Sequence, residues 1–458
     1  MKIFIGTSVF VSIRGELKCI KIFIFYAKIM LISFSMMTSS LSTAENNLFF
    51  SVAGRYESSS NALLSDNDEI ELSGLLISPK IGMSIKRPDQ VFNVDFSSDI
   101  NRYNKDEFDS ENYNFNGYFH RNRENLKSKI SVLYRDEQIR DNTFDLDGNL
   151  QDPKDNRIVG VTTYELNYAM SEINSFNWQT SYQDVSYKTE KEINNYSDYQ
   201  YGSTGLEWQH KITPLRYLTA SIKTSQYKSS FEFEFALQPY INPLIGFYIP
   251  PPKPTEIAEV STVASTTDVN VGFGIQMTEK VNWNLLIGSS EVKTTQEATI
   301  PFFNYLDLNR EIIIYEESEY INKNKEKQFN ANINVQENRY FYSIDASISN
   351  EDSSNGTIIK KSTVSVYGGF NLNVKNSINW RIIFQREKPI DEELVTVNQS
   401  LFRDYYRSRF SYDRKISKNF KATLEYSYYF LKNNDFDEKI SSQILSLSLV
   451  YSPKPKRW

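Results

Sequence analysis

From residue 45 onward, apolar side chains recur at every second position, the spacing that places alternate residues of a β-strand on opposite faces. One face of segment 328–336 carries only apolar side chains: Phe329, Ala331, Ile333 and Val335. Asparagines occupy the positions between them, and segments 217–225 and 421–430 alternate in the same way. Because the spacing of an amphipathic helix is almost absent, the chain is predicted to be all-β.

Short and long breaks alternate strictly between these runs. The short breaks, which read as tight hairpin turns, are 87–90, 121–125, 171–174, 213–214, 278–280, 337–339, 375–377 and 415–419. The longer polar connections include 141–156, 229–264, 291–324 and 435–439. Eight hairpins, with a further strand at 48–57 and another at 442–451, predict about eighteen strands. Sixteen is the alternative count, since Pro79 and Pro88 leave two possible turns in one region.

An even number of antiparallel strands, with short turns at one end and long loops at the other, is typical of an outer-membrane β-barrel. Lipid requires every backbone polar group to be paired, which a closed barrel achieves. Many of the predicted strands are long enough for a tilted crossing of about 9 to 11 residues. A soluble all-β protein is the alternative, but its strands average nearer 5 to 6 residues. We therefore expect a transmembrane antiparallel up-and-down β-barrel.

Composition agrees with this prediction. The mean hydropathy is negative, and no apolar run after the N-terminal segment reaches the roughly 18 residues that a membrane-spanning helix needs. The chain nevertheless has 30 Tyr and 30 Phe, which suits aromatic girdles at the two membrane interfaces. A helical membrane protein is thereby excluded at this stage.

Residues 1–44 read as a cleaved signal peptide. Lys18, Lys21 and Lys28 supply positive charge, residues 29–37 are mostly apolar, and Ala44 ends a small-residue cleavage site. An uncleaved anchor helix is the alternative, although Lys28 interrupts its apolar run; translation could also begin at Met30. The barrel is then expected to occupy 45–458 in the outer membrane of a Gram-negative bacterium. Lipid, lipopolysaccharide and the barrel-insertion machinery are its expected partners.

The predicted mature chain offers few groups for other chemistry. It keeps 46 basic and 56 acidic residues, a formal charge of −10 that argues against a nucleic-acid partner. The sole cysteine, Cys19, lies in the signal segment, so neither a disulfide nor a thiolate metal site is expected. The two histidines, His120 and His210, fall next to predicted periplasmic turns, whereas outer-membrane proteases and lipases act at the outer face. No enzymatic activity, cofactor or metal site is predicted.

The polar face of the strands is expected to line a lumen, because a barrel of this size leaves room for water. The lumen-lining candidates are Asn116, Gln179, Lys223, Asn332, Asn334, Asp345, Arg381, Arg407, Arg409 and Glu425. Three tyrosines that could stack on sugar rings share this face: Tyr118, Tyr367 and Tyr429. Each residue alone could simply solvate the wall or pair across strands. Together they predict a hydrophilic track without one dominant charge, suited to neutral or mixed polar solutes such as sugars.

Segment 229–264 is the most unusual connection, since it combines many aromatic residues with a proline-rich run. The residues predicted to form a plug, a constriction or a partner-docking element are Phe231, Phe233, Tyr240, Phe247, Tyr248 and Pro251. The alternative is an extension of the adjacent hairpin above the membrane, with a rigid tip.

Three segments carry a resemblance to a known family. YQYGSTGLEW at 199–208 leads through Thr213-Pro214 into YLTAS at 217–221, and the last strand reads SQILSLSLVY at 442–451. In these features and its hairpins the chain is similar to β-barrel porins encoded at exopolysaccharide or capsule loci. The resemblance implies a porin-like conduit in polysaccharide secretion, working beside a periplasmic polysaccharide export protein.

Two other functions remain open at this point. One is a general or sugar-selective diffusion porin, and the other is a non-conducting surface barrel that binds a partner through its extracellular loops. The C-terminus departs from the usual outer-membrane pattern, in which the last strand ends the chain on an aromatic residue. Here Tyr451 is followed by seven residues that include Pro453 and Pro455, which cannot continue the ladder.

Overall fold

The computed structural model describes residues 45–61, 70–138, 156–188, 198–236, 240–241, 248–249, 255–278, 280–304, 312–352, 358–389, 402–434 and 438–457. The predicted signal segment, 1–44, lies outside the described residues, so its cleavage stays a prediction.

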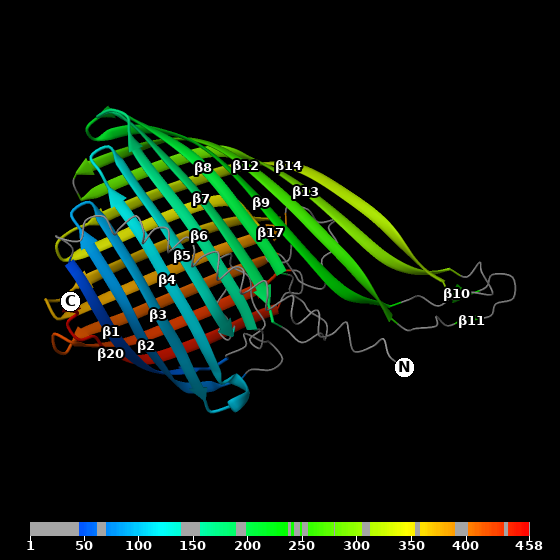
Figure 1. Ribbon diagram of the computed structural model, residues 1–458, viewed down its shortest axis with the longest axis horizontal. Helices are drawn as coiled ribbons and strands as arrows, with labels where there is room; N and C mark the ends of the chain where they lie inside the picture. Colours follow the sequence, from blue (N-terminus) through cyan, green and yellow to red (C-terminus); the bar gives the residue numbers. More distant parts are fainter. Residues whose placement is uncertain are drawn as a thin grey trace.

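The described chain forms a closed antiparallel barrel (Figure 1). Its eighteen long strands are β1 (Glu45–Ser59), β2 (Leu72–Arg87), β3 (Gln90–Tyr103), β4 (Ser110–Asn122), β5 (Leu126–Gln138), β6 (Asn156–Ala169), β7 (Asn174–Tyr187), β8 (Asp198–Thr213), β9 (Arg216–Ala236), β12 (Thr255–Thr278), β13 (Val281–Asn304), β14 (Ile312–Gln336), β15 (Tyr340–Asp352), β16 (Ile358–Asn371), β17 (Asn376–Pro389), β18 (Arg403–Lys415), β19 (Phe420–Asn433) and β20 (Glu438–Tyr451). Each pairs with the next along the chain, and β1 pairs with β20 to close the ring. The prediction of an eighteen-stranded barrel is confirmed.

Tight turns occur at all eight predicted places. Pro88 lies in the turn between β2 and β3, whereas Pro79 lies inside β2 opposite Val52. The ladder between β2 and β3 skips Ser78 and Pro79, because proline has no N–H to donate. The β16–β17 turn lies slightly earlier than predicted: the Asn373 carboxamide accepts hydrogen bonds from the backbone N–H groups of Lys375 and Asn376 there, at 2.9 and 3.0 Å.

The reading of 229–264 and 291–324 as polar connections is wrong in large part. Strands β9, β12, β13 and β14 are 21 to 25 residues long, against 13 to 16 for the other barrel strands. Their ladders continue to Ala236↔Thr255 and to Asn304↔Ile312. These strands therefore project beyond the end of the barrel, by roughly 30 Å at ~3.3 Å per residue (Figure 1). We call this projection, residues 230–236, 255–263, 293–304 and 312–324, the four-strand extension.

Two short pieces complete the described sheets. Strands β10 (Tyr240–Ile241) and β11 (Tyr248–Ile249) pair with each other near the tip of the extension (Figure 1). Strand β21 (Lys456–Arg457) pairs with Leu48 and Asn47 of β1. The ladder therefore breaks after Tyr451, as the prolines predict, but it resumes for two residues.

Helical structure contributes little to the described residues. A single turn of 3-10 helix, η2 (Asp106–Phe108), lies between β3 and β4. No helix in the described ranges has the length and apolar character needed to cross a membrane.

Candidate functional site

Side-chain exposure distinguishes the two faces of strand β20. In a closed barrel, side chains on the concave face converge and cover one another, while those on the convex face diverge. On β20, Leu445, Leu447 and Leu449 are 53%, 57% and 46% exposed, whereas the intervening Ser446 is 4% exposed. The leucines therefore lie on the convex, outer face and the serine on the concave, inner face.

The outer face carries an apolar belt around the barrel. Its exposed members include Phe50, Ile81, Phe96, Tyr113, Trp178, Leu206, Ile222, Val269, Ile287, Ile333, Ile344, Val364, Phe384, Phe410, Leu424 and Leu447. Aromatic residues flank the aliphatic ones. Tyr340, Phe370 and Phe420 lie beside the tight turns, and Tyr56 and Tyr182 lie toward the opposite end. This arrangement is typical of the lipid-facing band of a barrel, with its two girdles.

The thirteen residues predicted to face the lumen all lie on the concave face by strand register. They are Asn116 and Tyr118 on β4, Gln179 on β7, Lys223 on β9, Asn332 and Asn334 on β14, Asp345 on β15, Tyr367 on β16, Arg381 on β17, Arg407 and Arg409 on β18, and Glu425 and Tyr429 on β19. Their part in transport stays a prediction. Asn116, Gln179 and Lys223 lie on the other side of the ring from those on β16 to β19, so the thirteen do not form one site.

One polar group joins β14 and β15. The Asn332 carboxamide donates to the Asp345 carboxylate and, at 3.2 Å, to the Ser343 hydroxyl. Ser343 in turn donates to Asp345 at 3.1 Å. This network holds both predicted residues against the wall, which agrees with the simpler role of cross-strand pairing.

A second group, on β16 to β19, is basic. Register places Tyr367 opposite Arg381, and Arg381 opposite Arg409. Arg409 forms an ion pair with Glu425, and the Arg407 guanidinium lies over the Tyr429 ring, 4.8 Å from its centroid. We call Arg381, Arg407 and Arg409 the arginine cluster. Guanidinium groups outnumber carboxylates within this group, and the expected hydrophilic track without one dominant charge stays a prediction.

The concave face also carries apolar clusters that the sequence analysis did not predict. The larger one crosses six neighbouring strands and contains Val159, Val185, Tyr199, Tyr227, Ala264 and Val292. Within it the Tyr199 and Tyr227 rings stack at 5.4 Å. A smaller cluster contains Tyr405, Tyr429 and Leu431. In β8, Tyr199 and Tyr201 share a face with Ser203 and Gly205. This change from large aromatic to small side chains along one strand face is the sequence feature that could have predicted the cluster.

A buried ion pair lies near the loop end of the same wall. The Arg403 guanidinium contacts the Glu387 carboxylate at 2.8 Å, and the two side chains are 10% and 3% exposed. Gln385 also donates to Glu387 at 2.6 Å. The pair joins β17 to β18 across the long connection between them.

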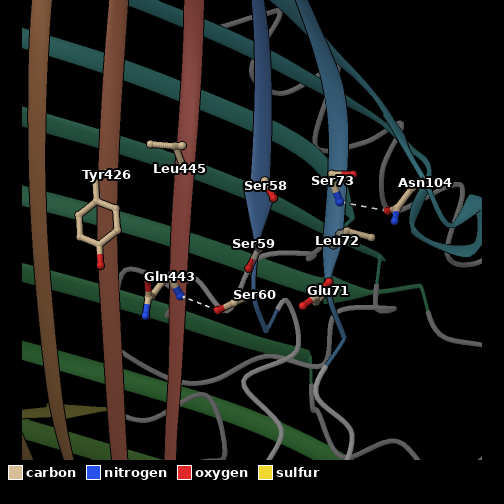
Figure 2. Close-up of a pocket in the computed structure, with 10 residues that line it drawn as sticks. All are labelled: Ser58, Ser59, Ser60, Glu71, Leu72, Ser73, Asn104, Tyr426, Gln443 and Leu445. Atoms are coloured by element: carbon tan, nitrogen blue, oxygen red, sulfur yellow. Dashed lines mark hydrogen bonds between the residues drawn. The ribbon is translucent and has the colours of Figure 1, made fainter.

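A hollow of about 410 Å³ lies where β19 and β20 meet β1 and β2, across the closure of the ring (Figure 2). Its lining is Ser58, Ser59, Ser60, Glu71, Leu72, Ser73, Asn104, Tyr426, Gln443 and Leu445. The Gln443 backbone N–H donates to the Ser60 hydroxyl at 3.0 Å, as Figure 2 shows. This lining has one carboxylate and no histidine, so it lacks a general-base pair of the kind that hydrolases use.

The histidines have structural partners. His120 lies opposite Val91 and Lys129 near a tight turn, and His210 stacks on Trp208 at 5.7 Å and contacts the Asn174 carboxamide at 2.9 Å. Both lie near the end with the tight turns, as predicted. Within the ranges that the structure describes, no cluster of His, Cys, Asp and Glu could hold a metal ion.

The candidates for a plug or docking element belong to the four-strand extension and its tip. The backbones of Phe231 and Phe233 lie in β9, and those of Tyr240 and Tyr248 lie in β10 and β11. Phe247 and Pro251 lie outside the described residues. Because β9 and β12 lead away from the barrel (Figure 1), the backbone favours the extended hairpin over a plug, and a docking role stays a prediction.

No protein-family model matches the chain, and no curated protein matches its sequence. Among solved structures it is similar to the open form of the ferric-catecholate import receptor Fiu from E. coli K12, with 6% identity, a TM-score of 0.48, and coverage of 88% of this chain and 81% of the receptor. It is also similar to the ferric yersiniabactin uptake receptor FyuA from Yersinia pestis, with 8% identity, a TM-score of 0.47, and coverage of 90% and 80%. The outer membrane channel DcaP of Acinetobacter baumannii aligns with 10% identity, a TM-score of 0.40, and coverage of 90% and 99%.

Proposed function

We propose that this chain is an outer-membrane channel of a Gram-negative bacterium that conducts polar solutes and takes part in exopolysaccharide or capsule secretion. One observation carries the proposal: a closed ring of eighteen strands has an apolar belt on its convex face, and its concave face carries many polar side chains beside two apolar clusters. Barrels of 16 to 18 strands enclose an aqueous channel. Lipid would contact the belt, and water would fill the interior.

The unequal connections give the orientation. In outer-membrane barrels the short turns face the periplasm and the longer loops face outward. The four-strand extension would then stand outside the cell, where lipopolysaccharide and surface glycans lie. Insertion into the membrane requires the barrel-insertion machinery and a cleaved signal peptide at 1–44.

The concave face suits a glycan. Amide and hydroxyl groups such as those of Asn334 and Ser365 replace water around sugar hydroxyls, and tyrosine rings offer flat surfaces for the C–H faces of sugars. Tyr367 is held against Phe341 at 5.1 Å, which fixes one such ring on the wall. Movement through the barrel would be passive, and a periplasmic polysaccharide export protein would deliver the polymer.

Two other functions use the same wall. A general or sugar-selective diffusion porin needs the same aqueous interior but no polymer and no export partner. A non-conducting surface barrel would use the four-strand extension to bind a partner, and the length of that extension is the feature that favours it.

Swelling of liposomes that contain the refolded chain 45–458 tests the channel. We expect neutral sugars to enter at rates that fall with sugar size, and folded barrels that admit no sugar would contradict the proposal. Removal of the chain from its own bacterium separates the first two functions: loss of extracellular polysaccharide supports secretion, whereas unchanged polysaccharide with slower sugar uptake supports a diffusion porin.

A further inference from the structure

We propose that the arginine cluster is a binding subsite for sugars that carry a carboxylate, so that the glycan in the barrel is acidic. The inference rests on the proposed function, because it requires a glycan to reach the concave face. It adds a substrate class that the sequence analysis did not predict.

Several cations of the concave face have a carboxylate partner: Lys80 with Asp95 at 2.8 Å, Arg157 with Glu137 at 2.8 Å, Arg403 with Glu387 at 2.8 Å, and Lys421 with Asp413 at 3.0 Å. Across the described residues, neither Arg381 nor Arg407 has a carboxylate within 4.0 Å. Among the described residues, Glu425 is the one ion-pair partner of Arg409. One of the three guanidinium groups is therefore paired with a carboxylate, and the other two are not.

The arginine cluster is costly to the sheet. Arg381 and Arg409 lie directly opposite each other in the ladder between β17 and β18, and like charges at such positions destabilise a sheet. Serine and asparagine side chains would keep the wall hydrated without this charge repulsion. An anion seated between the two guanidinium groups removes the repulsion, and each group can bind a carboxylate through two parallel hydrogen bonds.

Two members of the arginine cluster are accessible from the interior of the barrel. The Arg409 side chain is 47% exposed, and Arg381 is also exposed, although both lie on the concave face. Their guanidinium groups are therefore open to a solute in the interior. The paired Arg403, in contrast, is buried.

An aromatic ring beside the arginine cluster distinguishes a sugar from a simple anion. Tyr367 lies opposite Arg381 in the ladder and is 44% exposed, whereas Tyr429 is buried beneath the Arg407 guanidinium. One exposed phenol ring thus borders the cationic centre, and a ring surface beside a guanidinium group matches a pyranose that carries its carboxylate on the ring. Inorganic phosphate would use the charges but would gain nothing from the ring.

Equilibrium binding to the refolded barrel 45–458 in detergent tests this subsite without requiring conduction. The probes are a galacturonate trimer, a neutral maltotriose and inorganic phosphate, titrated by calorimetry. The variant is Arg381→Gln combined with Arg409→Gln, which keeps polar side chains and removes the facing charges. The matched control is Arg414→Gln, because Arg414 lies on β18 too but on the convex face. Heat-modifiable gel migration checks that each variant folds.

We expect the galacturonate trimer to bind the wild-type barrel and the Arg414→Gln variant, and to bind the double variant at least about tenfold more weakly. Raising the salt concentration should weaken wild-type binding, since the site is charged and open to solvent. Equal binding of the trimer to the double variant, tighter binding of phosphate than of the trimer, or no binding of the trimer overturns the subsite. Sugar entry into liposomes is measured separately, so the channel can stand while the subsite fails.

Discussion

Arg381 on β17 lies directly opposite Arg409 on β18, on the concave face of the barrel. The pair places two positive charges side by side in a chain whose formal net charge is −6. The acidic character of the whole chain therefore says little about the field inside the barrel. Side chains that face the solute, rather than the net charge, set which ions and sugars the wall favours.

Reversing one of these charges should change ion selectivity. In the Arg381→Glu variant we expect the permeability of anions relative to cations to fall, because a carboxylate then faces Arg409 and neutralises it. The measurement is the reversal potential of the channel in a potassium chloride gradient. Arg414→Glu, on the outer face of β18, is the matched control and should leave the reversal potential unchanged. An Arg381→Glu channel with wild-type selectivity would show that the cluster does not face the ion path.

The apolar belt predicts where charge is least tolerated. Leu447→Arg places a cation within the belt and should lower the free energy of unfolding by about 2 to 4 kcal/mol in lipid vesicles. Gln443→Arg, on the same face but nearer the loop end of β20, should cost about 0 to 1 kcal/mol. Chemical denaturation of both variants in vesicles measures the difference. Equal destabilisation by Leu447→Arg and Gln443→Arg would mean that the centre of the lipid-facing belt does not lie at Leu447.

The Glu387–Arg403 pair predicts a nonadditive effect on stability. Arg403→Met should lower the free energy of unfolding by about 3 to 5 kcal/mol, because Glu387 would stay buried beside Gln385 without its guanidinium partner. Glu387→Met together with Arg403→Met should recover part of that loss, since both charges of the pair are removed and the buried Lys361 is the nearby charge that remains. A double variant whose loss of unfolding free energy equals the sum of the losses in Arg403→Met and in Glu387→Met would argue against the pair.

Low pH should weaken a surface ion pair at the loop end of β17 and β18. Arg386 donates to Asp404 at 2.6 Å, and this hydrogen bond lowers the pKa of Asp404 below its usual value of 3.8. A lowered carboxyl pKa stabilises the folded state above pH 3.8, and the stabilisation is lost as pH falls through the lowered value. Exposed pairs contribute at most about 1 kcal/mol. Unfolding free energies of wild type and Asp404→Asn should therefore differ slightly at neutral pH and converge in acid; a difference that grows on acidification would contradict this.

Particular residues show what the sequence could predict. The alternation at 442–451 and the tight turns were enough for the number of strands, because lipid on one face and water on the other impose a period of two. That contrast is weak in the four-strand extension. Segment 316–324 is polar on both faces apart from Tyr320 and Ile321, so it was predicted to be a loop although its backbone remains paired. Outside the lipid neither face of a strand has to be apolar, so alternation of hydrophobic residues no longer indicates a strand.

The arginine cluster needed cross-strand register. Arg407 and Arg409 are neighbours in sequence, and their face could be read from parity alone. That Arg381 lies opposite Arg409 depends on the alignment of β17 with β18, which are joined by residues 390–402, and no local pattern sets that alignment. The missing ion pairs at Arg381 and Arg407 likewise follow from the folded neighbourhood and not from composition.

Single-channel conductance of the refolded chain 45–458 in a planar lipid bilayer is the decisive test of whether the barrel is an open channel. A closed eighteen-stranded wall with a polar concave face should give stable, open channels whose current is reduced reversibly by the galacturonate trimer. A chain that is demonstrably folded and inserted, yet passes no current, would contradict the account of this protein as a conduit.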